Sequence, residues 1–239
     1  MKIIRLDSYE TLSQEAASLI RKELDRNKRA FLCAATGNSP TGTYNLLKKS
    51  FDLQPELFSG LRVIKLDEWG GVPLNDPATC ESYLQNHLIG PLQIGSDRYI
   101  SFHSNPQDPV VECDRIQQEL KKAGPIDICI LGLGMNGHLA LNEPGEFIEA
   151  GVHVAKLSRS SLLHPMIREM EIKPSYGLTL GMADILQSAF ILLIVSGGKK
   201  KKITSSLLNG RISTDLPASF LWLHPNVICL TDQDAYPED

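Results

Sequence analysis

Short apolar runs alternate along this chain with longer stretches of helical periodicity. The predicted strands cover residues 2–6, 30–34, 61–66, 126–131, 189–195 and 227–230, and the predicted helices cover residues 9–27, 41–49, 78–89 and 110–122. Strands that alternate with helices are typical of a parallel sheet with helices on both faces. The sequence therefore predicts an α/β fold, a doubly wound, mostly parallel sheet in a Rossmann-like three-layer sandwich. We expect a single domain over residues 1–239.

Composition excludes several classes of protein. The 239 residues carry a formal net charge of −4, which gives no general attraction to nucleic acid. No apolar run is long enough to span a bilayer, and the N-terminal residues lack a signal-peptide cleavage pattern. The five cysteines are scattered and form no C-x-x-C pair, which favours small buried hydrophobes in a reducing compartment. We therefore expect a cytoplasmic metabolic protein without a nucleic-acid or membrane partner.

The most informative loop follows the predicted strand 126–131 and runs to Gly145. Its three glycines, Gly132, Gly134 and Gly137, free the backbone at the carboxyl end of a strand, where open α/β sheets bind their ligands. His138 and Glu143 follow them. A histidine can carry a proton at neutral pH, and a carboxylate nearby can fix its tautomer. This combination predicts an active-site loop.

The same glycines also match G-x-G-x-x-G, the pattern of dinucleotide-binding loops. Such a loop opens directly into a helix, whereas Pro144 and Gly145 break a helix soon after this one. The next strand should also end near an acid, but the candidate strand 152–157 ends in a lysine and a leucine. The context therefore disfavours a dinucleotide, and no cofactor is expected.

A second loop, residues 34–43, follows the second predicted strand. Thr36, Gly37, Asn38 and Ser39 precede Pro40, where a helix can begin. Small and hydroxyl residues at a helix N-terminus can present several donors to one anion. Since the lysine and the spacing of a nucleotide P-loop are missing, the loop favours the phosphate of a small metabolite. An ordinary strand-to-helix turn is the alternative.

Charged residues follow two further strands. Asp67 and Glu68 come after the third strand, and because strand neighbours point to opposite faces, only one of them should face a ligand. Solvated acids in a turn are the alternative. Lys199 is the first lysine after two glycines near a helix start, where a lysine opposes the helix dipole unless an anion lies nearby. Arg168 is a weaker candidate for the same anion.

Metal binding is not expected. The six histidines include no pair at a short ligand spacing. Three of them, His87, His103 and His224, are interpreted as structural, and the role of His164 is left open.

Taken together, these loops resemble those of the glucosamine-6-phosphate deaminase family and its galactosamine-6-phosphate relatives. The resemblance rests on Thr36-Gly37-Asn38-Ser39-Pro40, on Leu66-Asp67-Glu68-Trp69, on the long run from Gly132 to Pro144, and on Lys199. It extends over nearly the whole chain. It implies an aldose–ketose isomerisation that needs no metal and releases ammonium, and galactosamine 6-phosphate or glucosamine 6-phosphate as the substrate.

The resemblance also implies a division of labour in the site. The loop from Thr36 to Ser39 and Lys199 would hold the phosphate, with Arg168 as a helper. His138 would open the sugar ring, oriented by Glu143 and helped by Asn136. Asp67 would remove the proton on C2.

Some features depart from the family pattern. Trp69 replaces a tyrosine, and Asn136 stands where some members have an aspartate. The segment after residues 227–230 is shorter than in the hexameric, regulated members, so regulation by an N-acetylated sugar phosphate is not expected. Trp69 and the stretch 163–166 are more similar to galactosamine-directed members, but the sequence leaves the substrate's C4 configuration and any homo-oligomer open.

Two alternatives share the fold. In 6-phosphogluconolactonases, which are hydrolases, an Asp-Glu-Arg motif replaces Asp-Glu-Trp, and Asn-Glu-Pro is missing after the histidine. A non-catalytic sugar-phosphate sensor would keep the phosphate loop and lose the acid–base residues. The chain keeps Asp67, His138 and Glu143, which favours an enzyme.

Overall fold

A seven-stranded parallel sheet forms the centre of the molecule. The computed structural model describes residues 1–168 and 170–237, and within them this sheet has the order β1-β10-β9-β6-β2-β3-β5. Its strands are β1 (Lys2–Leu6), β2 (Phe31–Ala34), β3 (Arg62–Lys65), β5 (Tyr99–Ile100), β6 (Ile128–Gly132), β9 (Phe190–Val195) and β10 (Val227–Asp232). All neighbours in it pair in parallel. The predicted fold class is confirmed.

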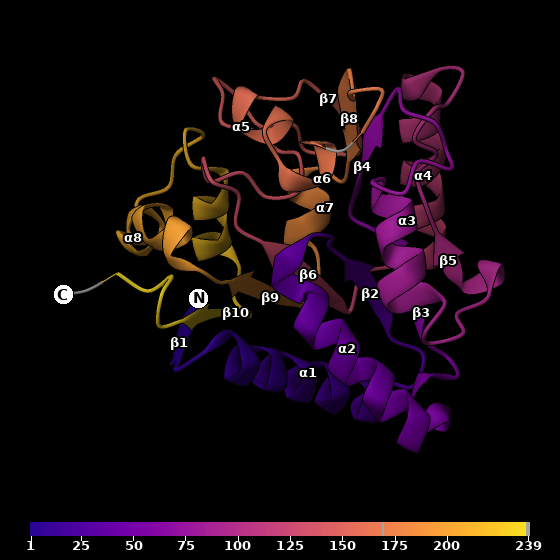
Figure 1. Cartoon of the computed structure of the whole chain (residues 1–239), viewed down its shortest axis with the longest axis vertical. Helices are drawn as coiled ribbons and strands as arrows, with labels where there is room; N and C mark the ends of the chain where they lie inside the picture. The colour runs from indigo at the N-terminus through magenta and orange to yellow at the C-terminus, as the bar shows by residue number, and fades with distance from the viewer. Residues whose placement is uncertain (169, 238–239) are drawn as a thin grey trace.

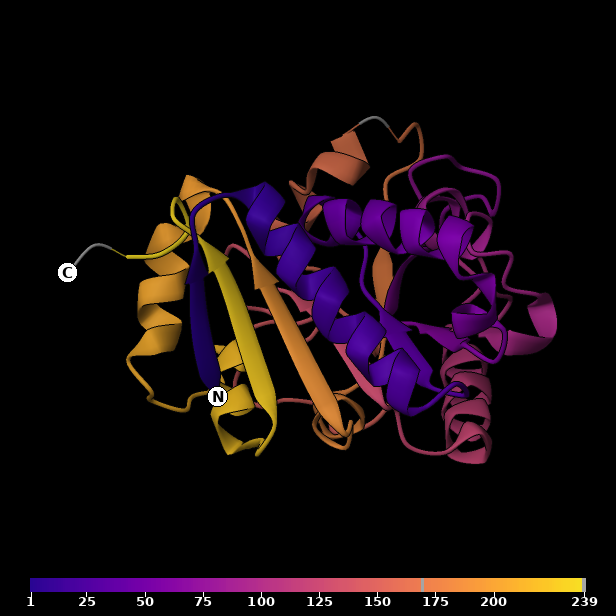
Figure 2. The ribbon, with the colours of Figure 1, turned by 90° about the horizontal axis from the view of Figure 1, so that it is seen from below.

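Helices connect these strands. They are α1 (Tyr9–Arg26), α2 (Asn38–Leu53), α3 (Cys80–Leu84), α4 (Pro109–Ala123), α5 (Arg159–Leu162), α6 (Pro165–Arg168), α7 (Met182–Leu186) and α8 (Lys201–Leu208). The predicted helix 78–89 is α3 followed by a π-helical turn, Gln85–Ile89. Figure 2 shows α1 and α2 lying across one face of the large sheet, with elements from later in the chain behind it.

Local sequence explains why α1 forms where it does. Ser8 and Thr11 form a reciprocal capping box at its start, which satisfies two backbone N–H groups. Leu12, Ile20 and Leu24 lie on one helical face and are completely buried against the sheet.

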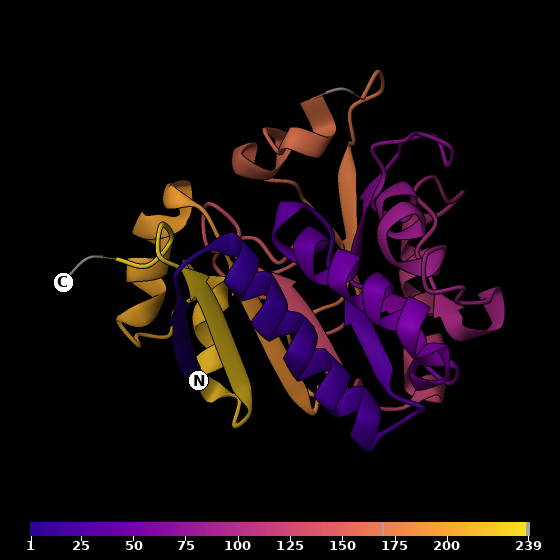
Figure 3. The same ribbon diagram turned by 60° about the horizontal axis from the view of Figure 1, so that its bottom comes forward.

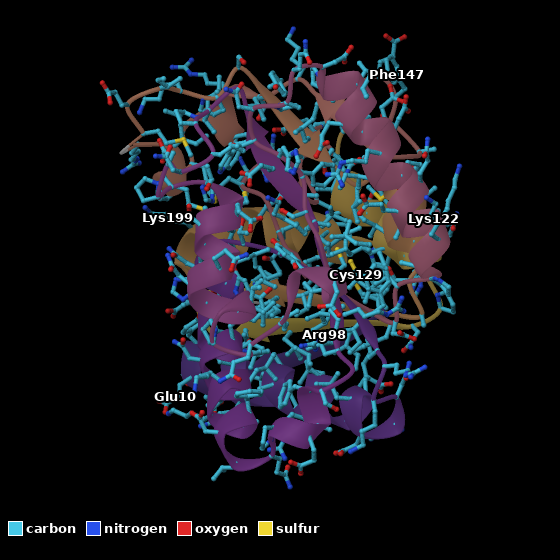
Figure 4. All side chains as sticks on the ribbon, turned by 90° about the vertical axis from the view of Figure 1, so that its right-hand side faces the viewer. Glu10, Arg98, Lys122, Cys129, Phe147 and Lys199 are labelled. Atoms are coloured by element: carbon cyan, nitrogen blue, oxygen red, sulfur yellow. The ribbon has the colours of Figure 1, made fainter. Side chains whose placement is uncertain are left out.

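The core lies along the central strands. Every residue of β9 is buried, as are the first four residues of β6. Cys129 of β6 has no exposed surface and lies in the interior of the molecule in Figure 4. All five cysteines are buried and free, as expected of small hydrophobic side chains in this core.

A second, three-stranded sheet was not expected from the sequence. Its antiparallel strands are β4 (Asp67–Gly70), β8 (Tyr176–Thr179) and β7 (His153–Ala155), in that order. Leu66 alone separates β3 from β4, so the chain changes sheet where we expected a loop. In Figures 1 and 3, α5 and α6 lie beside this small sheet. Asp67 is consequently the first residue of a strand that leaves the large sheet at the carboxyl end of β3.

Candidate active site

The predicted loops meet at one cavity of about 390 Å³. It is lined from β2 and the start of α2, from the start of β4, from the loop after β6, and from the segment that contains α5 and α6. Three strands of the large sheet point their carboxyl ends toward it, which is the usual place for a ligand in an open α/β fold.

The N-terminus of α2 forms an anion-binding wall of this cavity. Thr36, Gly37, Asn38 and Ser39 all line it, as the sequence predicted. Gly37 caps the helix with a φ of +92°, a conformation that favours glycine, and no side chain caps the first turn. The Gly37 carbonyl accepts a hydrogen bond of 2.8 Å from the Tyr83 hydroxyl. The loop is therefore fixed with helix N–H groups left available for an anion.

Lys200, and not Lys199, lines the cavity. Lys199 is exposed and lies at the outer edge of the molecule in Figure 4, which corrects the position expected from the sequence. The Lys200 ammonium donates a hydrogen bond to the Leu133 carbonyl, and burial lowers the pKa of Lys200 to about 8. A partly desolvated ammonium that lines the same cavity as the α2 N-terminus suits an anionic ligand.

Arg168 also lies apart from the cavity. It is the last residue of α6 and is exposed, and its side chain is not part of the cavity lining. His164, four residues earlier, lines the cavity instead. The sequence left the role of this histidine open.

Asp67 also lines the cavity, as the first residue of β4. The Cys80 thiol donates a weak hydrogen bond to it across 3.8 Å, and the Thr36 hydroxyl lies 3.5 Å from the same sulfur. Burial, followed by repulsion from Glu68, raises the pKa of Asp67 to about 7. A half-buried carboxyl group with this pKa can take up or release a proton at neutral pH.

Glu68 points the opposite way, as strand geometry predicts, and is completely buried. Its carboxylate accepts hydrogen bonds of 2.8 Å from the backbone N–H groups of Trp69, Cys80 and Glu81. It also pairs with the buried Lys65 ammonium at 2.7 Å, and that ammonium reaches Glu81 at 2.9 Å. Glu68 therefore fixes α3 to β4 directly after Asp67.

His138 and Glu143 form a second acid–base pair in the loop after β6. The Nδ1 atom of His138 lies 3.2 Å from Oε2 of Glu143, and both side chains are mostly buried. Gly134 is required here, because a Cβ atom at this position would lie 2.3 Å from the His138 ring. The predicted proximity of His138 and Glu143 is confirmed.

Several donors converge on Glu143. The Asn136 amide donates to Oε2 at 2.8 Å, and the Ser161 hydroxyl from α5 donates to Oε1. Burial by itself would raise the pKa of Glu143. The hydrogen bond and charge of His138, and the hydrogen bonds from Ser161 and Asn136, outweigh burial and lower the pKa to about 2. Glu143 is thus an ionised carboxylate that holds the His138 proton on Nδ1, which leaves Nε2 as an acceptor in the neutral ring.

Four site residues had no assigned role in the sequence analysis: Cys80, Ser161, His164 and Lys200. The hydroxyl of Ser161 reaches Glu143 from 18 positions away, so no local pattern connects them. Lys200 differs from Lys199 only in its position on a turn. Among residues 1–168 and 170–237, no group of three or more His, Cys, Asp or Glu side chains is arranged to hold a metal. No helix in these residues is long and apolar enough to cross a membrane.

Comparison with known proteins gives one family. The model for glucosamine-6-phosphate isomerases/6-phosphogluconolactonase matches residues 7–229. The putative deaminase AgaI of Escherichia coli (strain K12) is 39% identical, and the match covers 95% of this chain and 90% of that protein. The structure of a monomeric glucosamine-6-phosphate deaminase superposes with a TM-score of 0.92 at 34% identity, over 98% of both chains. A 6-phosphogluconolactonase from Trypanosoma brucei has a TM-score of 0.77 at 22% identity over 98% and 97% of the two chains, which shows a shared fold.

Proposed function

This chain belongs to the glucosamine-6-phosphate isomerase/6-phosphogluconolactonase family, and we propose that it converts an amino-sugar 6-phosphate into the ketose 6-phosphate and ammonium. The substrate is glucosamine 6-phosphate or galactosamine 6-phosphate, and the ketose is fructose or tagatose 6-phosphate. The observation that carries the proposal is one cavity lined by Asp67, by His138 and by an anion-binding helix N-terminus, with the Glu143 carboxylate 3.2 Å from His138 Nδ1.

Ring opening is the first step. Nε2 of the neutral His138 ring accepts the proton of the anomeric hydroxyl while the C1–O5 bond breaks. His138 then passes the same proton to O5. Between these two proton transfers the His138 imidazole is positively charged, and Glu143 stabilises it because the Glu143 carboxylate lies 3.2 Å from His138 Nδ1. The product is the open-chain amino aldehyde.

Isomerisation and deamination follow. Asp67 removes the C2 proton, and the C1 oxygen is protonated, which gives an enolamine. Asp67 is suited to this step because a base is most effective when its pKa lies near the working pH. Protonation of C1 gives an imine at C2, water adds to this C=N bond, and the nitrogen leaves as ammonium.

Binding of the phosphate is assigned to the α2 N-terminus and Lys200. This assignment replaces Lys199 by its neighbour, since Lys200 lines the cavity and Lys199 does not. Lys200→Ala should raise KM and leave kcat less affected, whereas Lys199→Ala, the matched control, should behave like the unaltered enzyme. An equal loss in the two variants would contradict the assignment.

The direct test measures ammonium and ketose 6-phosphate from glucosamine 6-phosphate and galactosamine 6-phosphate side by side. Hydrolysis of 6-phosphogluconolactone is measured in parallel. Ammonium release without lactone hydrolysis supports the proposal. Lactone hydrolysis alone would place the chain with the hydrolases of the family, and tight sugar-phosphate binding without turnover would make it a sensor.

The proposal also covers the domain organisation, the cellular compartment and the partners of the enzyme. We propose one catalytic domain over residues 1–239 that acts in the cytoplasm on a small sugar phosphate, without a nucleic-acid partner. The five free, buried cysteines support a reducing compartment. Sedimentation of the purified chain in the presence and absence of substrate tests for a homo-oligomer.

A further inference from the structure

His164 lies at the meeting point of the site's anion-binding groups. It lines the cavity together with the α2 N-terminus and Lys200. Its Nε2 atom is the nearest side-chain atom to the position that a Cβ of Gly37 would occupy, at 3.9 Å. The Trp69 ring packs against the imidazole with the ring centres 5.8 Å apart, which limits its movement. The ring therefore presents its Nε2 edge to the N-terminal turn of α2.

A backbone contact fixes the tautomer of this ring. The Met166 N–H donates to His164 Nδ1 across 3.3 Å, so the Nδ1 lone pair is occupied and the neutral ring carries its proton on Nε2. Within residues 1–168 and 170–237, His164 Nε2 has no hydrogen-bond partner. It is therefore a donor held at the cavity wall without an acceptor from the described part of the protein.

The chain contains a second histidine with the same local contact. In His224, Nδ1 accepts from the Asn226 N–H at 3.1 Å, and Nε2 donates to the Ser188 carbonyl at 2.7 Å. Both histidines thus use the N–H two residues later to direct an Nε2–H group outward. His224 satisfies that group inside the protein, whereas His164 directs it at the cavity.

Electrostatics keeps His164 neutral. Burial, with the nearby charges of His138 and Lys200, lowers the pKa of His164 to about 4. Protonation of Nδ1 would also oppose the Met166 N–H. The remaining ionisable group of the lining is Asp67, which does not contribute to this pKa shift. Near neutral pH, His164 is consequently a hydrogen-bond donor without a charge.

We propose that His164 is a specificity residue that donates its Nε2–H to the phosphate of the substrate, together with Lys200. The inference rests on the proposed function, because it takes a sugar phosphate as the ligand. His164, an uncharged donor, thus takes the place of Arg168, which the sequence analysis had suggested as the second side chain that contacts the phosphate. The anion would then receive helix N–H groups, one ammonium and one imidazole N–H, a set that selects an oxygen-rich anion.

Two substitutions separate the donor from the backbone contact. His164→Asn keeps an oxygen near Nδ1 for the Met166 N–H and removes the Nε2 donor. His164→Gln places an amide N–H near the former Nε2. Calorimetry would measure the dissociation constants of a hexitol 6-phosphate and of the unphosphorylated hexitol for both variants and the unaltered protein, after melting curves confirm that each variant is folded.

We expect His164→Asn to weaken hexitol 6-phosphate binding ~10- to 100-fold, since it removes a hydrogen bond to a charged group, and to leave hexitol binding unchanged. His164→Gln should recover part of the loss. Equal weakening of both ligands, or no weakening of either, would overturn the inference, as would a glutamine variant no better than the asparagine variant.

The pH dependence distinguishes a neutral donor from a cation. The affinity ratio between the unaltered protein and His164→Asn cancels the titration of Lys200 and of the ligand. A ratio that stays constant from pH 6 to pH 8 supports the neutral donor, and a ratio that falls over this range would contradict it. Because binding is measured without turnover and ammonium release is assayed separately, a failure of this inference is distinguishable from a failure of the proposed function.

Discussion

Asp67 and Glu143 are two carboxyl groups that serve one cavity and have opposite acid–base properties. At the start of β4, burial and then repulsion from the adjacent Glu68 raise the pKa of Asp67 to about 7, and its one weak side-chain donor, the Cys80 thiol, does not offset them. Glu143, in the loop after β6, accepts hydrogen bonds from Asn136 and Ser161 and lies against His138, so its pKa falls to about 2. The same chemical group is a proton carrier in the cavity wall at Asp67 and a fixed negative charge next to His138 at Glu143.

The difference shows that surroundings, and not residue type, assign the roles. Donors that favour the charged form make a carboxylate an orienting group, whereas desolvation and a like charge make it a base at neutral pH. Glu68 extends the comparison, because it is adjacent to Asp67 in sequence and yet, with four hydrogen-bond donors, serves the structure.

The comparison is tested most strongly by Asp67→Asn. If Asp67 is the base, kcat should fall ~10²- to 10⁴-fold, and exchange of the C2 proton with solvent should be lost. Steady-state kinetics and proton exchange followed by NMR measure both. A loss confined to KM would show that Asp67 binds substrate and performs no proton transfer.

Glu143→Gln should have a smaller effect. The amide keeps the shape of the carboxylate but cannot stabilise a charged His138, so turnover of the cyclic substrate should fall about 10- to 100-fold. With an analogue locked in the open-chain form, this variant should recover most of its C2-exchange rate, and Asp67→Asn should not. Equal rates for the two variants with that analogue would refute the division of labour.

In the unaltered enzyme, the pH dependence of kcat/KM should reveal the different ionisation of Asp67 and Glu143. Since Asp67 must be ionised to act as a base, kcat/KM should rise tenfold per pH unit below about 7 and level off above it. Titration of Glu143 should cause no change of kcat/KM near neutral pH, because the pKa of Glu143 is about 2. Above about pH 8, loss of the Lys200 charge should lower kcat/KM again.

Lys200→Arg provides the control for the upper limb. An arginine stays charged throughout this range, so the decline above pH 8 should weaken while the limb near pH 7 stays in place. An unchanged upper limb would assign the decline to another group.

Stability should respond to the two carboxyl groups with opposite signs, by ~1–2 kcal/mol each, because solvent at the cavity screens part of each group's interactions. The pKa of Asp67 is raised on folding, so its favourable contribution is present below pH 4 and lost as pH rises through 7. Asp67→Asn should therefore stabilise the protein at pH 8 and have little effect at pH 4.

The pKa of Glu143 is lowered on folding, so its contribution is present above pH 4.5 and lost as pH falls toward 2. Glu143→Gln should therefore destabilise the protein at pH 7 and progressively less as the pH falls below 4.5. Denaturant unfolding at each pH gives the free energies, and the same sign for both variants at pH 8 would contradict the comparison.

The sequence by itself determined six of the seven strands of the large sheet, all except the two-residue β5, and the loops that follow them. Apolar periodicity marks buried strands and helix faces residue by residue, so the predicted strands and helices agree with the structure apart from their ends. The short helices α5 to α8 were not predicted. His138 and Glu143 are also predictable as a pair, because five residues of one short loop keep them close. The anion-binding wall follows in the same way from the residues before α2.

Only the tertiary structure decided the positions of those site residues that depend on contacts between distant parts of the sequence or on the rotation of a single turn. Strand β4 finds its partner β8 more than a hundred positions later, and that pairing sets the direction of Asp67. Lys199 and Lys200 share a 3-10 turn, where each residue is rotated by about 120° from the last, so one position separates an exposed side chain from one in the cavity. Ser161 and His164 reach the site because the segment of α5 and α6 packs beside the small sheet. Local propensity does not predict such packing, because the packing energy comes from neighbours that only the folded chain brings together.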